Sequence, residues 1–377
     1  RSTRGWSYGN PISDPRTGEI IKGHVSLGSL RVRQDFLIAT GLLSPFEDGS
    51  TVPPEMLEMA LARLRQLSAH EVGHTLGMAH NFAASVNERA SVMDYPHPQV
   101  SLKNGKITLD DAYAVGIGSW DKVAITFAYQ DFPEGTDEQA ALDKHLSDAF
   151  ASGQRFISDA DARPQGGAHP YAHLWDNGKN AAEELERVLE IRKVALRNFS
   201  EKAIRNGQPY SDLEEVLAPI YFFHRYQTEA AVKLIGGLDY NFAVRGGQPQ
   251  LANSPVSPQE QKAAMKALLA TLNPSQLALS EELLQLLPPK AYGYGRGRES
   301  FTARTGVGFD AIGATETAAN MTISLLLHPQ RAARLVEYHA RNQSQPGLHG
   351  IIDQLIAATW RAKNLKGMEG QVQRTVE

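Results

Sequence analysis

Cysteine is absent from the 377 residues of this chain. The sequence therefore excludes disulfides and thiolate metal ligands, so that any metal ion must be held by histidine, aspartate, glutamate or tyrosine. No apolar run reaches the roughly 18 residues of a bilayer-spanning helix, and we expect no transmembrane segment in this sequence. The formal net charge is only -4, which argues against a nucleic-acid partner or a general attraction to anionic membranes.

Histidine is also scarce, yet three of the twelve histidines fall within HEVGHTLGMAH, residues 70–80. Apolar residues at helical spacing follow a pair of prolines and predict a helix that runs from about residue 54 to Gly77. On this helix His70 and His74 project from one face and can share an ion. Gly77 lets the backbone turn sharply, so that His80 can approach the same ion. The segment therefore predicts a metal site with three imidazole ligands and an open position for water.

Neutral imidazoles suit a borderline-soft cation, and we expect zinc (Zn2+) on His70, His74 and His80. Glu71 follows His70 directly and lies one turn before His74. From there its carboxylate can reach a water on the ion without being a ligand itself. We therefore expect Glu71 to be the general base of a hydrolytic reaction.

The remaining sequence predicts mostly helix. A turn at residues 13–19 precedes the apolar stretch from Ile20 to Leu27, which is typical of a strand. A polar, turn-rich segment at residues 131–138 indicates a domain boundary, so we predict one region at 1–131 and a mostly helical domain at 132–377. The fold class is α+β, predominantly α-helical. Further helices are expected at 32–40, 109–129, 138–152, 181–206, 212–235, 258–272, 274–287, 314–327, 330–342 and 348–364.

The segment 70–80 matches HExxHxxGxxH, the extended zinc signature of the metzincin metalloproteases, and the chain resembles that clan. SVMDYP, residues 91–96, resembles the Met-turn that passes beneath the metal in metzincins, with Met93 as its methionine. SWDKVAITFAY, residues 119–129, is similar to the helix that closes metzincin catalytic domains. More closely, the whole chain resembles the bacterial Met-zincin family of secreted peptidases.

This resemblance implies a metzincin-like region with a partial sheet, zinc helix and Met-turn, followed by the helical domain. It implies a zinc-dependent endopeptidase that cleaves polypeptides outside the cytoplasm, in the periplasm, in the medium or at the cell surface. Tyr95 resembles the tyrosine of astacin- and serralysin-type enzymes, which ligates zinc or swings away to stabilise the transition state. Only 69 residues precede His70, and the chain begins with Arg1. We therefore expect upstream strands to be missing and an upstream region of the same protein to pack on the catalytic part.

Two other functions stay open. A helical binding or assembly module with a vestigial or structural metal site predicts a fourth protein ligand, or no zinc. A zinc hydrolase of non-peptide substrates predicts a small closed pocket in place of an elongated cleft. Single residues also have plainer interpretations: Tyr95 as a buried tyrosine bonded to backbone, Met93 as a soft core residue, and Asp94 as a brace of the turn or a partner of a ligand histidine.

The other histidines carry less information. His97 is expected to face solvent or a loop, and His224 to be packed in the core or bonded to a neighbour. His169 and His173 have i, i+4 spacing, but proline and glycine surround them and we do not expect a second metal there. The glycine-rich stretch YGYGRGR, residues 292–298, is expected to form a loop near the cleft.

Overall fold

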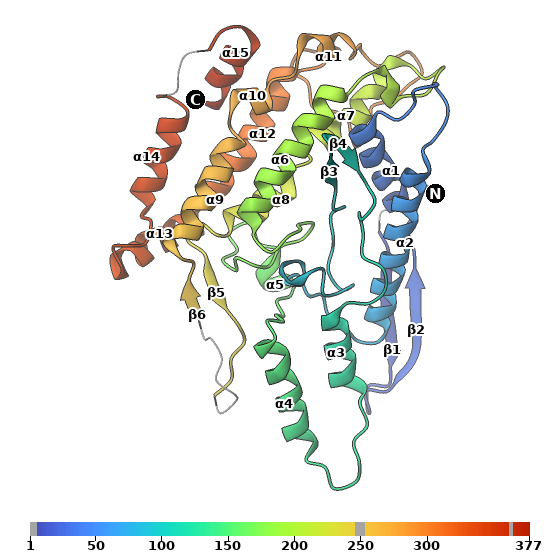
Figure 1. The fold of residues 1–377 in the computed structure, drawn as a ribbon, viewed down its shortest axis with the longest axis vertical. Helices are drawn as coiled ribbons and strands as arrows, with labels where there is room; N and C mark the ends of the chain where they lie inside the picture. The colour runs from blue at the N-terminus through green and yellow to red at the C-terminus, as the bar shows by residue number, and fades with distance from the viewer. Residues whose placement is uncertain (1–5, 246–252, 362–364) are drawn as a thin grey trace.

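The computed structural model (Figure 1) describes residues 6–245, 253–361 and 365–377. Its strands are β1 Tyr8–Ser13, β2 Ile20–Ser26, β3 Ser101–Lys103, β4 Lys106–Thr108, β5 Leu238–Tyr240 and β6 Asn253–Pro255. Its α-helices are α1 Leu30–Leu43, α2 Pro54–Thr75, α3 Ser119–Tyr129, α4 Glu138–Ala151, α5 Asp159–Ala162, α6 Ala181–Asn198, α7 Leu213–Tyr221, α8 Arg225–Val232, α9 Pro258–Ala270, α10 Pro274–Leu277, α11 Glu281–Gln285, α12 Ala311–Leu326, α13 Pro329–Arg341, α14 Leu348–Ala358 and α15 Gly367–Val376. The short 3-10 helices are Ser85–Asn87, Glu201–Ala203 and Tyr210–Asp212. The predicted α+β fold with mostly helix is confirmed.

Helix α2 is the element that presents the histidines. Pro54 occupies its first turn, where a missing N–H costs nothing. Met56 and Leu67 are buried at helical spacing, whereas Leu57 is 55% exposed. The helix ends at Thr75. Gly77 then adopts a φ of +82°, a left-handed backbone conformation that residues other than glycine rarely adopt. The predicted helix from about residue 54 and its glycine stop are therefore present.

The β1–β2 hairpin lies along the C-terminal half of α2 (Figure 1). The two strands pair antiparallel, from Tyr8 opposite Ser26 onward. Contact with α2 is close enough that a Cβ added to Gly9 would lie 2.0 Å from the carbonyl oxygen of Glu71. The predicted strand at 20–27 is thus confirmed as β2, but β1 is the strand that borders Glu71.

The helical elements pack around several apolar cores. One core joins α1 and α2 to α6 and α7, through Ile38, Met56, Ile191 and Ile220. At this interface a Cβ on Gly41 would lie 2.3 Å from the side chain of Ile220. A second core lies among α6, α8, α9 and α12. The elements before and after residue 131 therefore share buried side chains.

Several predicted helices have different limits. The helix expected at 109–129 begins only at Ser119, because Gly116 is left-handed and Gly118 is extended. The helix expected at 181–206 ends at Asn198, where Phe199 turns extended and Ser200 caps a 3-10 helix. The helix at 212–235 is divided into α7 and α8, and the one at 274–287 into α10 and α11. Helix α14 ends at Ala358, and residues 362–364 of its predicted range lie outside the described residues.

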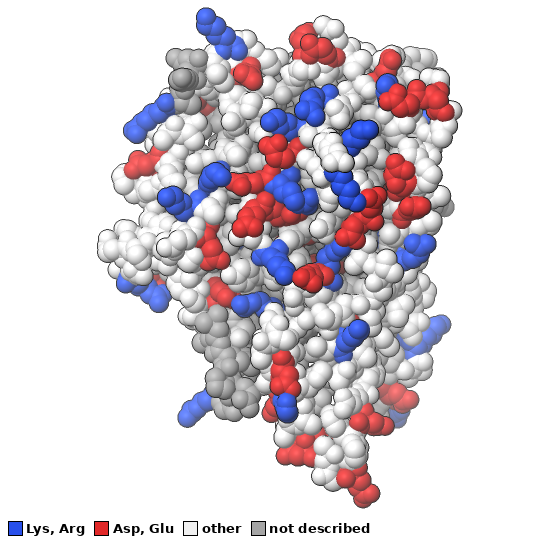
Figure 2. Space-filling view, viewed as in Figure 1, with Lys and Arg blue, Asp and Glu red and all other residues white. Residues whose placement is uncertain are grey.

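No helix among the described residues is both long enough and apolar enough to cross a membrane. On the face shown in Figure 2, acidic and basic side chains are intermixed over most of the surface. This pattern agrees with the small net charge of the sequence.

Candidate metal centre

The three histidines predicted to bind metal come together at the end of α2. His70 and His74 lie in its last turns, and the chain reversal at Gly77 brings His80 back toward them. One nitrogen from each ring lies within 4.8 Å of the other two. His74 Nε2 and His80 Nε2 are 3.1 Å apart. The structure therefore assembles one compact imidazole triad from a single short segment.

The second nitrogen of each ring faces an oxygen acceptor. The Nδ1 acceptors are the Val92 carbonyl at 2.7 Å from His70, the Met78 carbonyl at 2.9 Å from His74 and Asp159 Oδ2 at 2.8 Å from His80. Each Nδ1 therefore carries the proton, and each Nε2 presents a lone pair. Burial lowers the pKa of His70 to about 3 and also lowers the pKa of His80, so these rings are neutral. Converging lone pairs repel one another unless a cation lies between them, and this donor set fits zinc.

Asp159 was not predicted as part of the site. It lies on α5, a four-residue helix absent from the predicted elements, and it also accepts a hydrogen bond from Arg163. Arg163 in turn donates to the hydroxyl of Tyr95. Asp159 and His80 are 79 residues apart, and no spacing rule relates them. The site thus draws on residues from both sides of the predicted boundary at 131.

The segment 91–96 packs directly against α2. Met93 is buried, and a Cβ on Gly73 would lie 2.3 Å from its sulfur. The segment is held from the other side by Asp121 of α3, which accepts hydrogen bonds from the Ser91 hydroxyl at 2.5 Å and the Val92 N–H at 2.9 Å. Since Val92 also supplies the carbonyl that orients His70, α3 positions His70 through this segment.

Glu71 is buried beside the triad and lines a cavity. Burial raises the pKa of its carboxyl group, while His74, Arg63 and a hydrogen bond from the Gly9 backbone lower it. The net shift is upward, which makes the carboxylate a better proton acceptor near neutral pH. Glu71 thus lies at the cavity beside the triad, and its role as general base stays a prediction.

Tyr95 covers the triad. Its ring centroid is 4.8 Å from that of His80 and 5.3 Å from that of His70. The side chain is half-buried, and its hydroxyl accepts a hydrogen bond from Arg163. Burial raises the pKa of Tyr95, so the hydroxyl keeps its proton.

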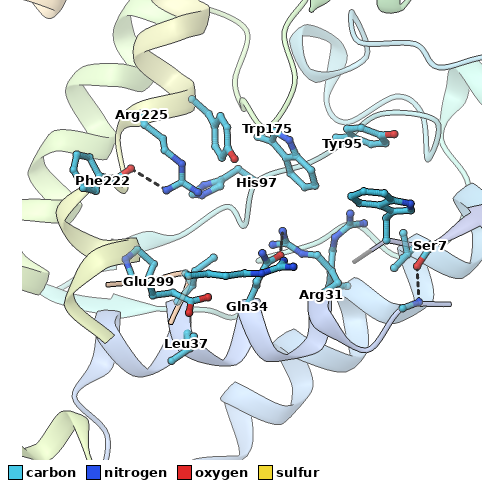
Figure 3. Close-up of a pocket in the computed structure, with 18 of the residues that line it drawn as sticks. Ser7, Arg31, Gln34, Leu37, Tyr95, His97, Trp175, Phe222, Arg225 and Glu299 are labelled. Carbon is cyan, nitrogen blue, oxygen red and sulfur yellow. Dashed lines mark hydrogen bonds between the residues drawn. The ribbon is translucent and has the colours of Figure 1, made fainter. Parts of the chain in front are cut away.

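A cavity of about 550 Å³ opens beside Glu71 and Tyr95 (Figure 3). It lies between α1 and the segment that joins α7 to α8, and Trp175 and Phe222 form part of its wall. Its volume falls within the range of roughly 300–1,000 Å³ that is typical of ligand pockets. Arg298 lines it as well, so the predicted loop at 292–298 does lie near the cleft.

Asp94 braces the turn. It accepts a hydrogen bond from the Tyr95 N–H at 2.6 Å, and it lines a second cavity of about 190 Å³ together with Asp176 and Gln66. Burial raises the pKa of Asp94 well above its ordinary value, and the nearby Asp176 raises it further. Of the two roles proposed for Asp94, the bracing role is the one that these contacts describe.

The prediction for His97 was wrong. Its side chain is buried against Phe223, with ring centroids 4.9 Å apart, and lines the larger cavity. His224 is packed in the core as predicted. His169 bonds to the Tyr240 carbonyl and His173 to Glu229, so these two histidines serve separate partners.

A family model described as Met-zincin matches residues 53–367, which is well over half of the chain. The matched range contains the imidazole triad, the segment 91–96 and Asp159. The chain matches no curated protein and no solved structure in these comparisons.

Proposed function

The chain belongs to the Met-zincin family, and on this basis we propose that it is a zinc-dependent endopeptidase whose ligands are His70, His74 and His80. The observation that carries the proposal is the convergence of three imidazole nitrogens, one from each ring, beside a buried carboxylate. Among the described residues the ligand cluster has three members. Three protein ligands are typical of catalytic zinc sites, whereas structural sites are closed by four.

Zinc in this position would supply a Lewis acid and lower the pKa of a water molecule to about 7. Glu71 accepts the proton of the attacking water and later donates it to the leaving amine, because its raised pKa suits both steps. Tyr95 donates a hydrogen bond from its hydroxyl to the oxyanion of the tetrahedral intermediate. Arg163 fixes the Tyr95 ring and, through Asp159, is connected to His80.

The cavity beside Glu71 supports a polypeptide substrate, because it can take a side chain while the main chain crosses the triad. We propose an extracytoplasmic location, which rests on the resemblance to secreted peptidases alone. Fractionation of the producing cells tests this location. Recovery of the protein solely with the cytoplasm contradicts it.

The test of the catalytic proposal compares the wild type with Glu71→Gln. Zinc content is measured by elemental analysis, and cleavage is measured on a denatured protein mixture. We expect about one zinc per chain in both proteins and a fall in cleavage by about 10²–10⁴-fold in the variant, the usual contribution of a general base. Glu55→Gln, in the exposed first turn of α2, is the matched control and should cleave like the wild type. Equal cleavage by wild type and Glu71→Gln, or a wild type that binds no zinc, contradicts the proposal.

A further inference from the structure

The arginines that line the cavity beside the triad outnumber the carboxylates that form ion pairs with them. Four arginines line it: Arg31, Arg63, Arg225 and Arg298. Arg31 is neutralised by Asp35, with the closest N–O distance at 2.5 Å. Within the described ranges, the other three form no ion pair with a carboxylate. Of the two acidic residues in the lining, Glu299 is paired with Arg33, which does not line the cavity, and Glu71 is the proposed base.

Arg63 is the most unusual member of this group. Its side chain is 2% exposed, and in the described part of the chain neither Nε nor Nη1 has a hydrogen-bond partner. Its guanidinium carbon lies 5.7 Å from the ring centroid of Trp175, and that of Arg31 lies 5.0 Å from the same ring. The guanidinium groups of Arg31 and Arg63 therefore both lie within cation–π distance of the Trp175 indole. Asp35 and Glu71 act on the Arg63 charge, but neither forms an ion pair with it. A buried cation with no directly paired carboxylate is costly, and an anion in the cavity would offset that cost.

Position along α2 connects Arg63 to the catalytic centre. Arg63, Leu67 and Glu71 follow one another at intervals of four residues on one face of the helix, and all three line the cavity. Eight residues of helix correspond to about 12 Å. A side chain plus one or two residues of an extended peptide spans this distance.

Arg225 approaches from the opposite wall. Figure 3 shows the Arg225 guanidinium next to His97 and across the cavity from Arg31. In this view Trp175 lies between Arg225 and Tyr95. One of its nitrogens donates to the Phe222 carbonyl at 3.2 Å. The planar guanidinium has further N–H donors in a fork that matches a carboxylate.

We propose that this cavity is a carboxylate-binding subsite, in which Arg63 and Arg225 hold an acidic side chain or the free C-terminal carboxylate of the polypeptide near the scissile bond. The apolar walls formed by Trp175 and Phe222 cover the aliphatic part of such a residue. The inference rests on the proposed peptidase function for its substrate class, and it adds a preference for negative charge.

The test measures binding, so that it does not depend on turnover. Zinc-loaded Glu71→Gln protein is titrated with fluorescein-labelled peptides in matched pairs, and fluorescence anisotropy gives Kd. One pair differs by glutamate against glutamine within an amidated peptide, and the other by a free carboxylate against an amide at the C-terminus. We expect the charged member of at least one pair to bind about tenfold or more tightly, as charge-assisted hydrogen bonds allow. The pair that shows the difference identifies the source of the carboxylate.

Variants assign the preference to the arginines. Arg63→Gln and Arg225→Gln, each in the Glu71→Gln background, should reduce the difference in Kd to below about threefold, and Arg63→Lys should retain part of it. Arg205→Gln is the control, because Arg205 packs on Phe46 and does not line this cavity. If Arg63→Gln does not fold, as judged by circular dichroism, Arg225→Gln decides the question. Equal Kd values within both peptide pairs overturn the proposal, as does an unchanged preference in the folded arginine variants.

The outcomes also separate this proposal from the proposed function. A wild-type enzyme that cleaves peptides, combined with equal binding of charged and neutral peptides, overturns the subsite and leaves the peptidase intact. A wild type that cleaves nothing, combined with a retained preference for the carboxylate, overturns the peptidase and leaves the subsite intact.

Discussion

Each histidine of the triad is oriented by a different part of the chain. His70 and His74 donate to backbone carbonyls, whereas His80 donates to the carboxylate of Asp159. A carboxylate partner fixes the tautomer and raises the basicity of the ligand more strongly than a carbonyl does. Asp159 is therefore the residue outside the triad on which metal affinity should depend most.

Asp159→Asn should weaken zinc binding by about 10–100-fold, the usual effect of losing the partner of a ligand histidine. The amide oxygen can still accept a hydrogen bond, but it carries no charge. Competition with a chelator of known affinity measures the change. Asp161→Asn is the matched control on the same helix, because Asp161 accepts a hydrogen bond from Tyr240 instead. Identical affinities for wild type and Asp159→Asn would show that His80 needs no charged partner.

The buried pair Asp94 and Asp176 predicts a pH dependence of stability. Burial raises the pKa of Asp176 to about 8, against roughly 3.9 for an unfolded aspartate. Between these values the folded protein holds a proton that the unfolded chain has lost, so stability falls as the pH rises through this window. Asp176→Asn removes this titration. The variant should therefore gain stability relative to the wild type between pH 5 and pH 8, by about 1 kcal/mol or more.

Urea unfolding at the two pH values measures this gain. Asp143→Asn, in the exposed part of α4, is the control, and its stability relative to the wild type should be the same at both pH values. A difference between Asp176→Asn and wild type that is the same at pH 5 and pH 8 contradicts a raised pKa.

Local residues of the site could be predicted from the sequence, and distant ones could not. His70, Glu71, His74 and His80 lie within one helix and one turn, where helical geometry alone brings the side chains together. Asp159, Trp175 and Arg225 reach the same place through tertiary packing, which no spacing rule encodes. His97 was mispredicted for the same reason, since its burial depends on Phe223 in a distant segment.

At the scale of elements, α3 stabilises the segment that carries Met93. Asp121 accepts hydrogen bonds from the Ser91 hydroxyl and from the N–H groups of Val92 and Gly118. Asp121→Asn replaces the charged acceptor with an amide that has a single acceptor oxygen. We expect the free energy of unfolding to fall by about 2 kcal/mol, the range for hydrogen bonds to a buried charged group.

Chemical denaturation at pH 7 measures this loss. Asp148→Asn is a suitable control, because Asp148 forms an exposed i, i+4 ion pair with Lys144 that contributes little. A loss no larger than that of the control would mean that the segment holds its conformation without α3.

Element types were predicted better than element limits. Helical periodicity identified α2, α6 and α9, because each buries one apolar face. The limits depended on features outside this periodicity. One example is Gly116, whose left-handed conformation precedes α3. Another is Ser280, whose hydroxyl accepts a hydrogen bond from the Leu283 N–H and so caps the start of α11 as a separate helix. The four-residue α5 is too short to show any period.

At the scale of the whole molecule, the predicted regions 1–131 and 132–377 share a core. Ile38 and Met56 of the first region pack with Ile191 and Ile220 of the second. Asp159, which accepts a hydrogen bond from His80, also belongs to the second region. The division at residue 131 stays a prediction about organisation, and the shared core predicts that the two regions unfold as one cooperative unit.

A protease site inserted in the exposed loop at residues 131–137 tests this expectation. After cleavage the two fragments should elute together in gel filtration and keep the zinc, because the interface buries large apolar side chains. Ile220→Ala removes a fully buried side chain at this interface and should cost about 2–5 kcal/mol, enough to favour separation after cleavage. Val336→Ala, on the exposed face of α13, is the control and should leave the cleaved fragments associated. If the fragments of the cleaved wild type separate and residues 1–131 alone retain zinc, the catalytic region is independent. Asp159 then cannot be required for the metal centre, because a region that holds zinc without Asp159 must orient His80 by other means.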